Sequence, residues 1–255
     1  MNYYVGMKVT RKSYNNDIVF IITEIKDNNA LLKGVDVRLY ADAPLDDLEL
    51  TDRNDDYVPE FDLNISDRDE YFYLPGKILH IDGDKEYLNK CMNFYKKCGI
   101  KAVGKQILES RMPNEISYLI KEIKPDILVI TGHDAFNKGH DLNNIDSYKN
   151  SKYFVSSVIE ARNIEKSHDK LVIIAGACQS AYEELIKAGA NFASSPKRIN
   201  IHALDPSIIA VNLALTDTNS FIDIKEILNK TKYGKDGIGG LVGKGMMYVG
   251  YPRSN

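Results

Sequence analysis

The pattern of apolar and polar positions changes once along the chain, close to residue 76. In residues 1–50, short alternating segments are separated by turn-forming clusters at positions 15–17 and 27–29. No stretch there has the 3.6-residue period of an amphipathic helix. We predict short strands at positions 6–10, 18–25, 30–34 and 38–40. Short strands joined by tight turns are typical of small barrels, so this region is predicted to form an SH3-like β-barrel.

From residue 76 onwards, apolar strands alternate with amphipathic helices. Short apolar runs rich in β-branched residues occur at 127–130 and 172–175, as expected for buried strands. Further strands are predicted at 78–81, 100–104, 191–195 and 200–203, and helices at 84–97, 114–124, 151–164 and 181–187. Strands that alternate with helices form right-handed βαβ units. The pattern therefore predicts an α/β domain over residues 76–255, with a doubly wound, mainly parallel sheet.

The stretch between the two regions is acidic and poor in aliphatic residues. It includes the sequence TDRNDDYVPEFDLNISDRDE. Such a composition does not support a core of its own, and we predict a solvated linker over residues 51–75.

Three of the predicted strands are followed, at the same distance in the sequence, by a residue whose side chain can take part in catalysis. Asp84, His133 and Cys178 are each the third residue after an apolar run. The carboxyl ends of parallel strands share one edge of a sheet, where ligands bind in open α/β folds. If the last two strands are neighbours, a thiol and an imidazole meet there, which is the minimum requirement for nucleophilic catalysis. The helix that follows Cys178 would favour the thiolate through its positive end.

Each of these residues has a purely structural alternative. A free cysteine is most often a small buried apolar residue, and this is also the role we assign to Cys91 and Cys98. Asp84 is a favoured residue type for the N-cap of the helix that begins after it. His202 competes with His133, because it lies in a polar stretch near a predicted sheet end.

The charge and the cysteine content of the chain indicate which binding partners and which cellular compartment to expect. The chain has 255 residues, a net charge of −3 and three cysteines. The weak charge gives no reason to expect binding to nucleic acid or to an anionic membrane. An odd number of cysteines without a C-x-x-C pair favours a reduced, cytoplasmic environment. The sequence has no apolar run of about 18 residues, so we expect no membrane span.

The two central strand ends resemble those of the caspase-like clan of cysteine peptidases. They are DILVITGH, which ends at His133, and VIIAGACQS, which contains Cys178. The second matches part of the caspase signature Q-A-C-[RQG]-G, whose His lies about 50 residues upstream. The sequence departs from the clan in one respect, because Gly132 precedes the His and Asp134 follows it, where the clan usually has Gly.

Within that clan, the chain resembles the YabG family of sporulation-specific peptidases from end to end. The stretches that carry the resemblance are VTRKSYNNDIVF, LKGVDVRLYADAPLDDL, GKILHIDGDKEYL, DILVITGHDA, YKNSKYFV, IIAGACQSAYEELIKAGANFASSPKRINIHALDP and YVGYP. The resemblance implies a caspase-like α/β fold and a cysteine endopeptidase of the sporulating cell. Its expected location is the cytoplasm, with association with the spore as an alternative.

The resemblance also implies protein substrates, roles for site residues and a cleavage preference. The expected substrates are spore coat and germination-related proteins, cut after Arg or Lys. Cys178 is the expected nucleophile and His133 its partner, and the backbone N–H groups of Cys178 and Asp134 are expected to hold the oxyanion. Asp84 and Asp205 are the predicted carboxylates for a basic substrate side chain. We expect no metal or organic cofactor for this chemistry.

Two other classes of function stay open at this stage. The first is a non-catalytic scaffold, in which the barrel is joined to a receiver-like domain that recruits coat proteins. Residues 78–100 resemble the first strand and helix of a receiver, but Thr131-Gly132-His133 stands where a receiver has its phosphate-accepting Asp. The second is a redox or acyl-transfer enzyme that uses the same Cys178. The oligomeric state is left open.

Overall fold

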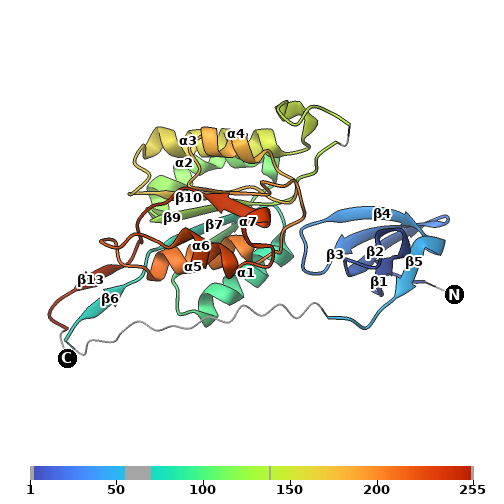
Figure 1. The fold of residues 1–255 in the computed structure, drawn as a ribbon, viewed down its shortest axis with the longest axis horizontal. Coiled ribbons are helices and arrows are strands. Elements are labelled where there is room, and N and C mark those ends of the chain that lie inside the picture. Colours follow the sequence, from blue (N-terminus) through green and yellow to red (C-terminus); the bar gives the residue numbers. More distant parts are fainter. Residues whose placement is uncertain (1–2, 55–69, 138, 254–255) are drawn as a thin grey trace. The chain divides into compact units, whose positions relative to one another are not determined.

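The computed structural model describes residues 3–54, 70–137 and 139–253. The chain divides into two compact units, Met1–Val58 and Pro59–Asn255. Both are drawn in Figure 1. Most of the linker predicted for residues 51–75 falls on positions 55–69, which lie outside the described residues.

The first unit is a five-stranded antiparallel sheet. Its strands are β1 (Lys8–Arg11), β2 (Phe20–Lys26), β3 (Asn29–Gly34), β4 (Tyr40–Pro44) and β5 (Leu48–Leu50), in the order β4-β3-β2-β1-β5. Alternate side chains point to one face and form a small core: Val9, Phe20, Ile22, Ala30, Leu32, Ala43 and Leu48. The antiparallel strands were predicted, whereas closure into an SH3-like barrel stays a prediction.

Two details of this unit differ from the prediction. The strand expected at 38–40 begins at Tyr40, because the Gly34 N–H bonds to the Leu39 carbonyl oxygen and closes a turn before it. β5 was not predicted, since its short sequence LEL lies in an acidic stretch.

The second unit is built around a six-stranded sheet. Its strands are β7 (Ile78–Asp82), β8 (Ala102–Gln106), β9 (Ile127–Thr131), β10 (Val172–Ala175), β11 (Phe192–Ser194) and β12 (Ile238–Gly240). Their order is β12-β11-β10-β9-β7-β8, and all neighbours are parallel except β11 and β12. The prediction of a mainly parallel sheet is therefore confirmed, as is the adjacency of β9 and β10.

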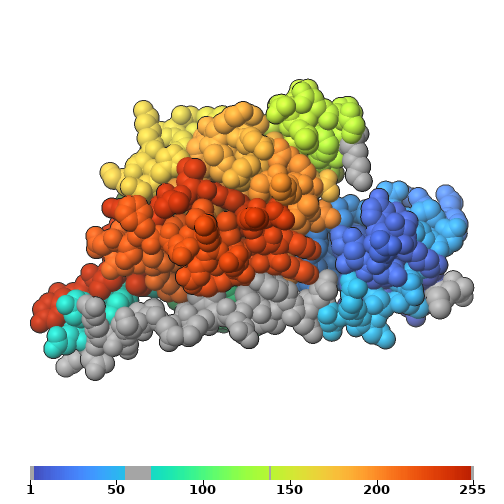
Figure 2. Space-filling view, viewed as in Figure 1, coloured from blue at the N-terminus to red at the C-terminus, as the bar shows by residue number. Residues whose placement is uncertain are grey.

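Helices lie on both faces of this sheet (Figure 1). On the upper face in Figure 1 are α2 (Met112–Ile123), α3 (Ser151–Ile164) and α4 (Tyr182–Lys187). Below the sheet are α1 (Lys85–Lys97), α5 (Asp205–Leu215) and α6 (Ile224–Asn229). In the space-filling view, yellow-to-red segments make up most of the visible face of this unit (Figure 2).

The main core lies between the sheet and the upper helices. Apolar residues of α2 and α3, spaced three or four positions apart, pack on alternate residues of β7, β9 and β10, as expected for amphipathic helices on a buried sheet. The core contains Leu79, Ile81, Met112, Ile116, Leu119, Ile120, Leu128, Ile130, Phe154, Val158, Ala161, Ile173 and Ala175, among others.

The largest error of the prediction concerns α5. Every residue of this helix from Asp205 to Ala214 is buried, so its sequence has no polar face and no helical period. The strand expected at 200–203 is not among the named strands of the described chain. Pro206 at the first turn was an available start signal.

The remaining elements are short. β6 (Phe72–Leu74), at the end of the predicted linker, pairs antiparallel with β13 (Tyr248–Gly250). The others are α7 (Gly234–Gly237) and the 3₁₀ helices η1 (Lys12–Tyr14), η2 (Leu45–Asp47), η3 (Glu109–Arg111) and η4 (Ile145–Ser147).

Candidate active site at the carboxyl ends of β9 and β10

Three predicted site residues follow strands that end level with one another. Ile130 of β9 is opposite Ala175 of β10, and Thr131 is opposite Asp82 of β7. The chain runs outward from β7 to β8 and then returns to β9 on the other side of β7. This reversal is the topological switch point at which open α/β sheets bind ligands.

His133 leaves β9 with its imidazole directed towards the start of α1. Its Nε2 atom is 3.2 Å from Oδ2 of Asp84. Its ring meets the ring of the buried Tyr87 edge-on, with centroids 5.7 Å apart. The His133 carbonyl accepts a hydrogen bond from the Asn150 side chain. The side chain keeps 17% of its surface exposed, so the imidazole is oriented but accessible.

Asp84 has two roles at once. Its Oδ1 atom accepts the N–H groups of Glu86 and Tyr87, which confirms the predicted N-cap of α1. Its Oδ2 atom is left for His133. The Asp84 N–H in turn bonds to the buried Asp82 carboxylate. The carboxylate that faces the imidazole is thus fixed by the helix that it caps.

Glu109 is a site residue that the sequence did not suggest. Its Oε1 atom accepts the backbone N–H of His133 at 2.7 Å. A Cβ atom at Gly83 or Gly132 would come within 2.3 and 2.4 Å of the same oxygen. Both glycines are therefore required for this carboxylate to lie beside the His133 backbone. Their positions directly after β7 and β9 were the only available signal.

Cys178 is completely buried. Its Sγ atom accepts the Ile201 N–H at 3.3 Å and lies 3.7 Å from the Ile201 carbonyl oxygen, to which the thiol donates. Ile201 belongs to the segment between β11 and α5. We call residues 195–202 of this segment the cover segment, because Ile201 within it contacts the thiol.

Gln179, directly after Cys178, fixes this turn in an unusual backbone conformation. Its φ is +56°, in the left-handed region that non-glycine residues rarely adopt. Its N–H bonds to Ser195 Oγ and the Ile199 carbonyl oxygen, each at 3.1 Å. Its side-chain Oε1 accepts the Phe136 N–H at 3.2 Å. Gln179 therefore links the loop of Cys178 both to the cover segment and to the loop of His133.

Asp134 turns its carboxylate inwards. Burial raises the pKa of Asp134 above its ordinary value of 3.8, although the hydrogen bonds that it accepts oppose this shift. Among the described residues, no hydrogen bond from the Asp134 N–H was found.

Asp205 and His202 meet in the turn that starts α5. Asp205 is completely buried, and its two oxygens accept the N–H groups of His202 at 3.0 Å and Lys232 at 2.9 Å. His202 Nδ1 accepts the Leu204 N–H at 3.2 Å, which suits a structural role in this turn. Asp84 and His133 are brought together, whereas the Asp205 carboxylate is engaged by the backbone around α5.

Comparison with known proteins places this chain in a family. The chain matches the family model described as YabG peptidase U57 over residues 4–62 and 60–252. It is 38% identical, over 286 aligned positions, to the sporulation-specific protease YabG of Bacillus subtilis (strain 168), with 99% of both chains covered. The chain belongs to the YabG peptidase family. The YabG resemblance inferred from the sequence motifs is thus confirmed, and it extends over both units.

The other two cysteines of this YabG-family chain lie in α1 and at its carboxyl end. Cys91 is buried in α1 and donates to the Ala203 carbonyl oxygen at 3.5 Å. Cys98 caps the carboxyl end of α1, and burial raises the pKa of its thiol. Both placements fit the structural roles predicted for them.

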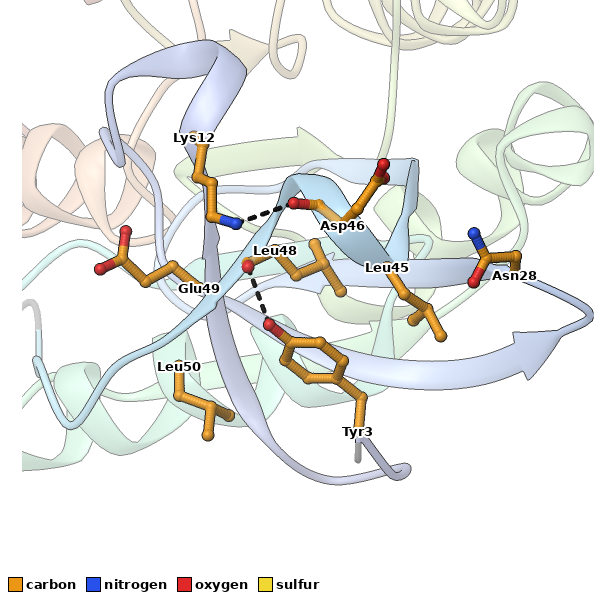
Figure 3. Close-up of a pocket in the computed structure, with 8 residues that line it drawn as sticks. All are labelled: Tyr3, Lys12, Asn28, Leu45, Asp46, Leu48, Glu49 and Leu50. Carbon is orange, nitrogen blue, oxygen red and sulfur yellow. Dashed lines mark hydrogen bonds between the residues drawn. The ribbon is translucent and has the colours of Figure 1, made fainter. Parts of the chain in front are cut away.

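A separate pocket in this YabG-family chain belongs entirely to the first unit (Figure 3). It has a volume of about 660 Å³ and is lined by Tyr3, Lys12, Asn28, Leu45, Asp46, Leu48, Glu49 and Leu50. The Lys12 ammonium and the Tyr3 hydroxyl both donate at 2.8 Å to backbone carbonyl oxygens of 46 and 48, as Figure 3 shows. These polar groups hold the start of β5 in place, and none of the predicted site residues lines the pocket.

The described part of the YabG-family chain contains neither a metal-binding cluster nor a membrane-spanning helix. Within residues 3–54, 70–137 and 139–253, no group of three or more His, Cys, Asp or Glu side chains is arranged to hold a metal ion. In the same ranges, no helix has the length and apolar character needed to cross a membrane.

Proposed function

We propose that this chain is a sporulation cysteine endopeptidase that hydrolyses protein substrates with Cys178 and His133. The observation that carries the proposal is the arrangement of the two residues at the level ends of neighbouring strands, in a chain of a peptidase family. Gln179, next to the thiol, is hydrogen-bonded to Phe136 in the loop of His133, which supports the closeness of the two loops.

The proposed reaction begins with attack of the Cys178 thiolate on the scissile carbonyl carbon. The thiol proton passes to His133, which then protonates the leaving amine. A water molecule hydrolyses the resulting thioester, and the second product leaves as a carboxylic acid. Backbone N–H groups of Cys178 and Asp134 hold the oxyanion in both steps. The Asp134 N–H has no hydrogen-bond acceptor within the described residues, which supports this assignment.

Asp84 orients the imidazole in this scheme. A carboxylate hydrogen-bonded to one ring nitrogen fixes which nitrogen carries the proton, and it stabilises the imidazolium that forms. The 3.2 Å contact between Asp84 and His133 Nε2 supports this role. The other ring nitrogen, Nδ1, is then the atom that exchanges a proton with Cys178.

Substrate cannot reach the thiol in the arrangement described, because Cys178 is fully buried. The Ile201 backbone holds Sγ from the cover segment. We therefore propose that substrate binding displaces the cover segment, which opens the space above Sγ. This makes the opening of the cover segment a step of the catalytic cycle.

Cleavage after Arg or Lys remains part of the proposal, with Asp84 and Asp205 as the carboxylates for the basic side chain. Asp84 lies beside His133, and binding a basic side chain would add to its contacts with the imidazole and with the N–H groups of Glu86 and Tyr87. Asp205 would have to exchange its backbone partners, the N–H groups of His202 and Lys232, for the substrate. If Ala variants of both leave the preference for Arg unchanged, neither carboxylate binds that side chain.

Spore coat and germination-related proteins are the proposed substrates, and the cytoplasm of the sporulating cell is the proposed location. The relative from Bacillus subtilis is named a sporulation-specific protease, which supports this context. No metal or organic cofactor takes part in the proposed steps.

The decisive experiment incubates wild type, Cys178→Ala and His133→Ala with extracted coat proteins and identifies the products by mass spectrometry. We expect cleavage by wild type alone, with new carboxyl termini at Arg or Lys. A loss of at least about 10³-fold is the usual result for removal of a catalytic nucleophile. If all three proteins cut alike, the Cys–His mechanism is wrong. If all three bind coat proteins and none cuts them, the non-catalytic scaffold becomes the better account.

A further inference from the structure

The side chain of Asp134 connects the two loops of the proposed active site. It is almost fully buried, and it accepts four hydrogen bonds. Its Oδ1 atom accepts the backbone N–H groups of Ala135 at 2.9 Å and Asn150 at 2.7 Å. These two bonds hold the loop of His133 against the start of α3. They account for one of the two carboxylate oxygens.

The second oxygen, Oδ2, acts on the loop of Cys178 through two buried hydroxyl groups. Ser180 donates to Oδ2 at 3.0 Å and accepts the Ala177 N–H at 2.9 Å. Ser151 also donates to Oδ2, and it accepts the Ala181 N–H at 2.8 Å. The backbone N–H groups on either side of Cys178 are thus held by one oxygen of a residue adjacent to His133.

We propose that the Asp134 carboxylate is a positioning residue that sets the distance between Cys178 and His133 through Ser180 and Ser151. This role is separate from that of the Asp134 backbone N–H in holding the oxyanion. It rests on the proposed function, because it concerns the same pair of reacting groups.

The four groups that donate to the Asp134 side chain explain why a carboxylate, and not an amide, is needed at this position. Each oxygen of a carboxylate accepts two hydrogen bonds, and Asp134 uses both oxygens in this way. An amide would place an N–H₂ group where Oδ2 receives two hydroxyl protons. Both hydroxyl groups would then lose their acceptor, although their contacts to Ala177 and Ala181 could survive. Asp134→Asn therefore loosens the connection with almost no change in volume.

The test measures kcat and KM separately for Ser180→Ala, Ser151→Ala, the double Ala variant and Asp134→Asn. The substrate is an internally quenched peptide that contains one Arg and one Lys. Ser157→Ala is the matched control, because Ser157 is a buried serine of α3 for whose hydroxyl no partner was found among the described residues. Unfolding temperatures are recorded for all variants, and each rate is measured well below them on folded protein.

A displacement of reacting groups by about 1 Å lowers the rate by about 100-fold. We expect kcat to fall by about 10-fold or more in each serine variant, with KM within about two-fold of wild type. Ser157→Ala should keep the kcat of wild type. The double variant should match Asp134→Asn, because all three side chains act through one oxygen and their effects are not additive.

The inference is overturned if Ser180→Ala and Ser151→Ala keep the wild-type kcat and lose only thermal stability. It is also overturned if the two serine effects multiply independently of Asp134. Should Asp134→Asn fail to fold, the two single serine variants still decide the matter. Cys178→Ala is measured alongside, because retained cleavage in that variant would refute the proposed function instead.

Discussion

β9 and β10 end side by side in one sheet, yet the residues that follow them are held in opposite ways. His133 is partly exposed, and its ring nitrogen contacts the side chain of Asp84. Cys178 is fully buried, and its sulfur contacts the backbone of Ile201. The imidazole is thus accessible and already oriented, whereas the thiol is covered.

This difference shows that the two halves of the proposed dyad depend on different parts of the fold. His133 relies on the capping residue of α1, which belongs to the second unit's first βα connection. Cys178 relies on Gln179 and on the cover segment, which comes between β11 and α5. Changes at the β7–α1 connection should therefore act on the imidazole first, and changes in the cover segment should act first on access to the thiol.

The largest effect is expected from removal of the charge at Asp84. Asp84→Asn keeps a good N-cap but loses the carboxylate that faces His133, so kcat should fall by about 100-fold with little change in stability. Asp84→Ala should also lose about 1 kcal/mol of unfolding free energy with the cap. The control is Asp223→Ala, which removes the N-cap of α6 and should lower stability without lowering kcat. An unchanged kcat in Asp84→Asn would show that the imidazole does not need this partner.

Access to the thiol should depend on Arg198, which anchors the cover segment. Its guanidinium donates to the Tyr148 hydroxyl at 2.7 Å and pairs with Glu183. Arg198→Ala should raise the rate of iodoacetamide labelling at Cys178 by about 10-fold, which corresponds to about 1.4 kcal/mol. Peptide mapping by mass spectrometry gives the rate at each cysteine, with Cys98 as the internal reference.

The control for this labelling experiment is Lys187→Ala. It removes an exposed ion pair with Glu184 on α4 and leaves the cover segment intact. Equal labelling in wild type, Lys187→Ala and Arg198→Ala would mean that Arg198 does not hold the cover segment over Cys178.

An effect on stability alone is expected at the turn before Cys178. Gly176 has a φ of +107°, and a Cβ there would lie 2.9 Å from Leu185 Cδ1 and 3.2 Å from Ser194 Cβ. Gly176→Ala should therefore lower the unfolding free energy by about 2–4 kcal/mol through backbone strain and overpacking. Gly139→Ala is the control, since Gly139 has a φ of +89° but open space around it. It should lose only about 1 kcal/mol, and equal losses in denaturant melts would exclude the packing contribution.

The smallest effect is a pH dependence at Glu183. Burial pushes the pKa of Glu183 upwards, but the hydrogen bond and charge of Arg198 outweigh it and hold the pKa below its ordinary value of 4.5. Because the folded pKa lies below the unfolded one, the stabilisation is present above pH 4.5 and is lost as the pH falls through the folded pKa. More than half of the Glu183 side chain is exposed, so the contribution should stay below about 1 kcal/mol.

Glu183→Gln tests this by thermal unfolding over a range of pH. The variant should have a slightly lower Tm than wild type near neutral pH, and the two curves should converge in acid. A constant difference in Tm across the range would show that the loss has another cause than the ion pair.

The parts of the fold that could be predicted are those with a clear hydrophobic period. α3 was predicted with its observed bounds, because its apolar residues recur on one side. β10 was predicted because four apolar residues stand between turn residues. α5 could not be found in this way, since it is buried on all sides and its burial depends on the elements packed around it.

Only those residues of the candidate site that closely follow a predicted strand could be predicted. Asp84, His133 and Cys178 were identified because each is the third residue after a predicted strand. When parallel strands end level with one another, residues at equal distances past their ends lie close together. The contacts of Glu109, Ser151 and Ile201 could not be predicted, because these residues belong to segments distant in the sequence from the residues that they contact. Their contribution depends on tertiary packing, which leaves no local pattern in the sequence.

The pairing of β6 with β13 has a consequence for the order in which the chain can fold during synthesis. β6 precedes every strand of the second unit's large sheet, and β13 follows all of them. During translation, β6 leaves the ribosome before the large sheet does, and it cannot pair with β13 until the whole sheet has been synthesised. Its side chain Leu74 stays 56% exposed even when β6 is paired, and Phe72 stays 38% exposed. During that interval β6 is an open strand edge, so translation speed and chaperone access should matter most for this short segment.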